Sequence, residues 1–127
     1  MMRMILVALG IAMFARPCVG LEYAKNGSDL IEACRAAASG SPLTTVQQGM
    51  CVGEVVALAW LAPGQINSAL RSCVPDNVDA QQMVQVVVNY LDRNQDRLRV
   101  PFEGLALEAL AQRWPCQKSP SGLQDND

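Results

Sequence analysis

Cysteine placement constrains this chain more than any other feature, because four of its five cysteines follow a stretch typical of an export signal. Residues 1–20 have a basic start at Arg3, an apolar run over residues 4–15 and a break at Pro17. The twelve residues of this run are too few to span about 30 Å of hydrocarbon as a helix. We therefore predict a signal peptide that is cleaved near Gly20, with a buried N-terminal helix as the alternative.

Removal of this leader would leave four cysteines in the folded protein. They are Cys34, Cys51, Cys73 and Cys116. An even number of cysteines in a small exported chain predicts two disulfides. Zinc is the alternative, but the four cysteines lack the close C-x-x-C pairs of most zinc sites, so we predict no metal. The residues before Cys18 do not form the small aliphatic stretch of a lipoprotein signal, so we also predict no membrane anchor.

Capping residues and hydrophobic periodicity predict four helices after the leader. Their starts are predicted at residues 26–29, Thr45, Asp79 and Pro101, and three of their ends near Gly40, Pro63 and Trp114. Thr45 and Asp79 are each followed three positions later by a glutamine, which is the capping-box spacing. A short additional turn within residues 65–71 would make a fifth helix.

Each predicted helix carries an apolar stripe that we interpret as its core face. The stripes are Leu30, Ile31, Cys34 and Ala38; Val52, Val55, Val56, Ala59 and Trp60; Met83, Val86, Val87, Tyr90 and Leu91; and Phe102, Leu105, Ala106, Ala109 and Leu110. The valines of the third segment would also suit a strand, but their spacing favours a helix. The predicted fold class is all-α, a small disulfide-stapled four-to-five-helix bundle over residues 21–116, preceded by the signal peptide and followed by a disordered tail, 117–127.

The helix order favours one disulfide pairing. Short connections make consecutive helices antiparallel neighbours, so the first helix lies beside the second and the third beside the fourth. This layout pairs Cys34 with Cys51 and Cys73 with Cys116, although two other pairings remain open. Closing loops of about 17 and 43 residues would stabilise the fold by roughly 3 to 4 kcal/mol each.

Composition argues against several classes of function. The formal charge of −2, from 10 basic and 12 acidic residues, gives no basic surface for nucleic acid. The chain has no histidine, and so lacks the commonest general base and metal ligand. It also shows no glycine-rich phosphate loop. We therefore predict that the protein is not an enzyme and holds no cofactor.

Three segments are candidates for contact with a partner protein. Gly49 and Gly53 flank Cys51 on a predicted helix, where glycine indicates close backbone approach, either to a neighbouring helix or to a partner. Glu54 lies beside them and could face a ligand, or only solvent. The candidate contacts in the charged connection after the third helix are Arg93, Asp96, Arg97 and Arg99. Such runs are most often solvated connections, and the loop over residues 62–71 is a further exposed candidate.

The second half of the chain has a distinctive order of residues. Its motifs are Cys73-Val74-Pro75; Asp79, Gln82 and Met83; Val87, Val88, Tyr90 and Leu91; and Trp114-Pro115-Cys116. This order resembles the Rap/Tai immunity proteins of bacterial type VI secretion. The resemblance extends over Gly27–Cys116, with Cys34 and Cys51 also matching. The family usually has tyrosine and glycine where this chain has Glu54 and Ala57.

The resemblance implies an exported antitoxin of the periplasm. Such a protein would bind and occlude a peptidoglycan amidase delivered by neighbouring cells, and could form a homodimer. The alternative from another class is a periplasmic structural or accessory protein that shares the fold and meets no toxin, because fold does not fix function.

Overall fold

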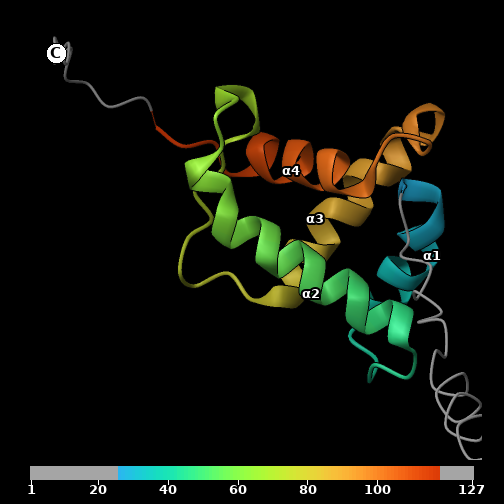
Figure 1. Cartoon of the computed structure of the whole chain (residues 1–127). Helices are drawn as coiled ribbons and strands as arrows, with labels where there is room; N and C mark the ends of the chain where they lie inside the picture. The colour runs from blue at the N-terminus through green and yellow to red at the C-terminus, as the bar shows by residue number, and fades with distance from the viewer. Residues whose placement is uncertain (1–25, 118–127) are drawn as a thin grey trace, which may run out of the picture.

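A computed structural model describes residues 26–117, which form a bundle of four α-helices (Figure 1). Helix α1 comprises Gly27–Ala38, α2 Val46–Leu61, α3 Ala80–Arg93 and α4 Phe102–Arg113. Three short 3₁₀ helices accompany them, η1 (Ala62–Gly64), η2 (Ser68–Leu70) and η3 (Gln95–Arg97). Within the described residues there is no strand, only two isolated β-bridges. The all-α prediction is confirmed. The predicted leader, 1–20, and residues 118–127 of the predicted tail lie outside the described residues.

Three of the helices begin with side-chain caps, and those at Thr45 and Asp79 are the ones predicted from the sequence. In each cap, the Ncap side chain accepts a hydrogen bond from the N3 backbone N–H, and the N3 side chain accepts one from the Ncap backbone N–H. The pairs are Asn26 with Asp29, Thr45 with Gln48, and Asp79 with Gln82. Each pair satisfies two backbone N–H groups that a helix start would otherwise leave unbonded. Helix α1 ends just before Gly40, which has a φ of +78°. A residue with positive φ cannot continue a right-handed helix, and glycine adopts this conformation at lower energy than other residues do.

Helix α3 lies at the centre of the bundle and packs against α1, α2 and α4. Its side chains Val84, Val87 and Leu91 are fully buried. The predicted stripe on α3 is therefore rotated slightly, because Met83 and Val86 are only half buried. The stripes predicted for α1 and α4 are buried at every position, so these two helices turn the expected faces inward.

The disulfides join Cys34 to Cys51 and Cys73 to Cys116, which is the pairing that the helix layout predicts. The first bridge links α1 to α2, and both of its cysteines are fully buried. The second links the segment before α3 to the residues after α4, and Cys73 is exposed. A backbone hydrogen bond from the Cys73 N–H to the Trp114 carbonyl, 2.8 Å, reinforces the second junction.

The start of α1 is held against the connection between α3 and α4. The Gly27 N–H donates to the Val100 carbonyl at 3.1 Å, and the Ser28 N–H donates to the Leu98 carbonyl at 2.9 Å. A Cβ at position 27 would lie 2.8 Å from the Leu105 Cδ1 atom and 3.2 Å from the Leu98 carbonyl oxygen, so any larger residue would force these neighbours to shift.

Removal of either disulfide should destabilise the protein strongly. We expect Cys34→Ala/Cys51→Ala to lower the free energy of unfolding by about 3 kcal/mol, and Cys73→Ala/Cys116→Ala by about 4 kcal/mol, because the second bridge closes the longer loop. Urea unfolding of the oxidised wild type and of each double variant measures these losses. Equal stability of all three proteins would contradict the prediction.

Candidate functional site

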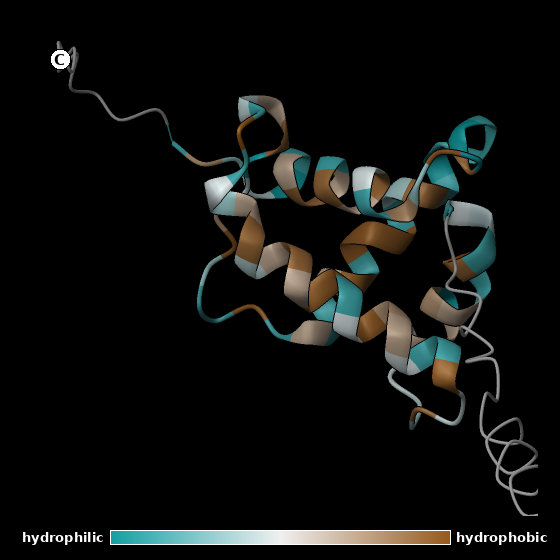
Figure 2. Cartoon of the chain, in the orientation of Figure 1, coloured by the Kyte–Doolittle hydropathy of each residue, from teal (hydrophilic) through white to brown (hydrophobic). Residues whose placement is uncertain are grey.

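Helix α2 is apolar on two opposite sides. Its inner side buries Cys51, Val55 and Ala59 in the core. Its opposite side carries Val46, Gly49, Gly53, Ala57, Trp60 and Leu61, all of them exposed. We call these six residues the outer face of α2. Intervals of three and four positions place them on one side of the helix, and Figure 2 shows hydrophobic colours along most of α2.

The large side chains of this outer face lie in solvent. Trp60 is 81% exposed, Val46 66% and Leu61 64%. No member of the face is charged. The prediction that Trp60 belongs to the core is wrong, because it lies five positions after Val55 and so about 140° around the helix from the buried side. Soluble monomers rarely expose contiguous apolar surface of this kind, which typically marks an interaction site.

Gly49 and Gly53 make the middle of the outer face flat. A Cβ built at either position would meet nothing within 4 Å. Tight packing against a neighbouring helix, one of the two interpretations of these glycines, is therefore wrong. Because neither residue has a side chain, the backbone of another molecule could approach α2 closely at this point.

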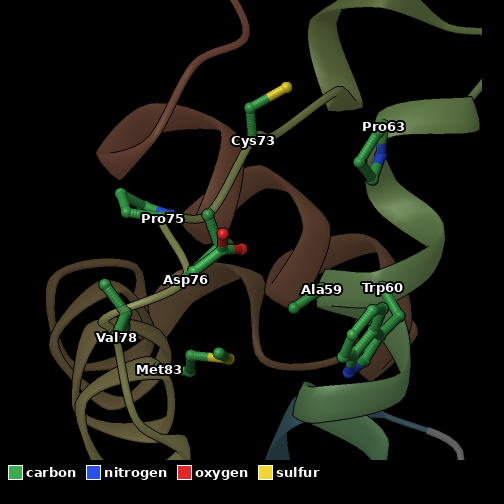
Figure 3. Close-up of a pocket in the computed structure, with 9 residues that line it drawn as sticks. Ala59, Trp60, Pro63, Cys73, Pro75, Asp76, Val78 and Met83 are labelled. Carbon is green, nitrogen blue, oxygen red and sulfur yellow. The ribbon is translucent and has the colours of Figure 1, made fainter.

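A groove of about 540 Å³ adjoins the outer face at the C-terminal end of α2 (Figure 3). One wall is Ala59, Trp60 and Pro63; the other is Cys73, Val74, Pro75, Asp76 and Val78, with Met83 of α3 between them. Asp76 is the one charged residue among these lining residues. Trp60 belongs both to the groove and to the outer face, which therefore form one continuous surface.

The residues predicted to contact a partner are spread over the molecule. Glu54 is half-buried on α2, beside Gly53. Arg93, on the last turn of α3, lines a separate hollow of about 350 Å³ with Arg113 of α4. Asp96 and Arg99 are exposed in the connection before α4, which Figure 2 colours mostly hydrophilic. The structure therefore brings neither Glu54 nor these three together with the groove.

Arg97 is engaged inside the molecule. Its guanidinium donates two hydrogen bonds to the Glu108 carboxylate, at 2.6 and 2.9 Å, and one to the Tyr90 hydroxyl at 2.8 Å. Tyr90 itself is buried and donates to Glu108. These bonds tie the connection before α4 to both α3 and α4. Such a bidentate ion pair orients a guanidinium firmly, so Arg97 has a structural role in this network.

The same network shifts the pKa values of Glu108 and Tyr90. Hydrogen bonds from Arg97 lower the pKa of the Glu108 carboxyl below its ordinary value, against the opposing effect of burial. Burial raises the pKa of the Tyr90 hydroxyl, and its hydrogen bond to Glu108 acts in the same direction. Glu108 is therefore ionised at neutral pH, as the paired guanidinium requires.

Among the described residues, no group of three or more His, Cys, Asp or Glu side chains could hold a metal ion. No helix in this part of the chain is both long enough and apolar enough to cross a bilayer. A helical body joined by two disulfides, with an exposed apolar face and an adjoining groove, is typical of a small protein that binds a partner.

The comparisons with known proteins give the family. The model of the family described as Rap1a immunity proteins matches residues 26–116, which is most of the chain. The chain belongs to this family, and the resemblance seen in the sequence is confirmed. It is an immunity protein, a kind of protein that binds a cognate effector toxin. No curated protein and no solved structure matches the chain.

Alanine at the two outer-face glycines should stabilise the protein. Each added methyl group enters open space and raises helix propensity, so we expect Gly49→Ala and Gly53→Ala to gain about 0.5–1 kcal/mol each in thermal or urea unfolding. Gly40→Ala is the matched control and should destabilise, because Gly40 has a positive φ. Destabilisation by Gly53→Ala would show that α2 packs differently.

The Arg97–Glu108 pair should make stability depend on pH. Because the folded-state pKa of Glu108 is lowered, its contribution is present above the unfolded-state pKa of about 4.3 and is lost as pH falls through the folded value. Glu108→Gln should lower the melting temperature at pH 7 and weaken its fall in acid. Glu103→Gln, which removes a carboxylate of the same helix and leaves the Arg97–Glu108 pair in place, is the matched control. Identical profiles for wild type and Glu108→Gln would contradict this.

Proposed function

We propose that this protein is a periplasmic immunity protein that binds and occludes a peptidoglycan amidase delivered by type VI secretion. The observation that supports this most is the outer face of α2, an uncharged apolar surface on a member of an immunity family. The protein acts by covering its partner and performs no catalysis itself. Aromatic residues such as Trp60 commonly carry much of the binding free energy at protein interfaces.

The disulfides support the compartment that we propose. Two bridges in a chain of this size are typical of oxidising environments such as the bacterial periplasm. Residues 1–20 have the sequence features of a cleaved leader. We propose that residues 21–116 form the immunity domain in the periplasm, where an amidase would meet its peptidoglycan substrate.

A rigid surface suits an inhibitor. Binding costs less conformational entropy when the contact surface is already ordered. The buried Cys34–Cys51 bridge fixes α2 on the core, so the outer face is presented without rearrangement. A second copy of this chain is the alternative occupant of the face, and light scattering of the free protein distinguishes a homodimer from a monomer.

A charge placed on the outer face should weaken toxin binding without weakening the fold. We expect Gly53→Glu to reduce affinity for a purified type VI peptidoglycan amidase at least tenfold, since burying an unpaired carboxylate is costly. The melting temperature should not fall, because Gly53 is exposed and a Cβ there meets nothing within 4 Å. Calorimetry and a peptidoglycan hydrolysis assay with the protein purified after export measure both effects.

Gln47→Glu is the matched control, since it adds the same charge at an exposed position of α2 outside the outer face. It should bind as wild type does. Full protection by Gly53→Glu would contradict the proposed surface. Loss of binding on charge reversal at Arg93 and Arg99 instead would assign the contact to the end of α3 and the connection that follows it.

A further inference from the structure

We propose that the groove beside Trp60 receives one apolar side chain of the partner, flanked by a lysine or arginine of the partner that pairs with Asp76. This inference rests on the proposed function, because the partner concerned is the amidase effector. It specifies which chemistry on that effector the immunity protein would recognise.

The lining of the groove favours an apolar occupant. Trp60, Pro63, Val74, Val78 and Met83 contribute most of its side chains. The volume of about 540 Å³ lies within the range of ligand-binding pockets, about 300–1,000 Å³. It can therefore hold one large apolar side chain together with part of the backbone on either side.

The wall that carries Asp76 is held in place by covalent and hydrogen bonds. The disulfide between Cys73 and Cys116 fixes one end of this wall. The Val78 N–H donates to the Pro75 carbonyl at 3.1 Å and closes a turn around Asp76. The capping box of Asp79 then leads directly into α3. A preformed wall of this kind lowers the entropic cost of binding.

Asp76 gives the groove its charge preference. Its side chain is exposed and forms no ion pair within residues 26–117. Figure 3 shows its carboxylate directed toward the open space between the two walls. Because no basic residue lines the groove, a cation on the partner would be attracted there and an anion repelled.

The position of the groove favours a segment of the same partner that covers α2. Trp60 lies on both surfaces, so a protein seated on the outer face would pass over the groove opening. An apolar anchor inserted at this point would sit near one end of the interface, where Asp76 could discriminate among partners. Charge complementarity of this kind contributes to specificity more than to total affinity.

Defined peptides test the groove directly. The probes are N-acetyl-leucyl-lysine amide, N-acetyl-leucyl-glutamate amide and N-acetyl-glycyl-lysine amide, titrated at millimolar concentration into the ¹⁵N-labelled protein purified after export. We expect the leucyl-lysine probe to shift the Trp60 indole signal saturably, and the leucyl-glutamate probe to bind at least about threefold more weakly. The glycyl-lysine probe should give no saturable shift. A Trp60→Phe variant assigns the indole signal.

Asp76→Asn should abolish the difference between the lysine and glutamate probes, whereas Asp96→Asn, at an exposed position away from the groove, should preserve it. Equal binding of both leucyl probes to the wild type would overturn the proposal. So would the absence of any shift at Trp60, or an unchanged preference in Asp76→Asn.

Titration of the amidase itself separates this inference from the proposed function. We expect Asp76→Asn to lower affinity for the amidase about threefold and to reduce the salt dependence of binding. If the amidase binds wild type and Asp76→Asn equally, the groove proposal fails and the proposed function stands. If the peptides bind as expected but wild type binds no amidase, the proposed function fails instead.

Discussion

The buried disulfide between Cys34 and Cys51 determines how α2 sits on the molecule. Cys51 must face α1, and Gly53, two positions later, then points about 200° away from it around the helix. Because α2 is apolar on two opposite sides, hydrophobic burial alone would accept more than one rotation of this helix. The bridge therefore selects which apolar residues enter the core and which form the exposed surface.

The rest of the surface depends on this choice and on the second bridge. Because α2 is fixed, Trp60 lies beside the segment that the Cys73–Cys116 disulfide holds in place. The groove forms between Trp60 and this segment. The connection before α4 is held separately, through the Arg97 pair with Glu108. The molecule thus combines a rigid core with an exposed apolar face on α2, as the proposed function requires.

Local signals made much of the fold predictable from the sequence, while the surface depended on contacts between distant residues. The caps at Thr45 and Asp79 and the stripe from Phe102 to Leu110 involve neighbours in sequence, and all occur as expected. Periodicity places Trp60 in the core wrongly, because it cannot orient a helix that is apolar on two opposite sides. The role of Arg97 depends on Glu108, eleven positions away on another helix. Asp76 lines a groove that residues of α2 and α3 complete, so local sequence could not predict its role.

The central claim is that the outer face of α2 meets the effector, and hydroxyl-radical footprinting of Trp60 tests it most directly. Trp60 is 81% exposed in the free protein, so its oxidation there should be fast. In complex with the amidase, the account predicts a large fall in the oxidation rate of Trp60, with the half-buried Trp114 as an internal reference. An unchanged rate at Trp60 in a saturated complex would contradict it.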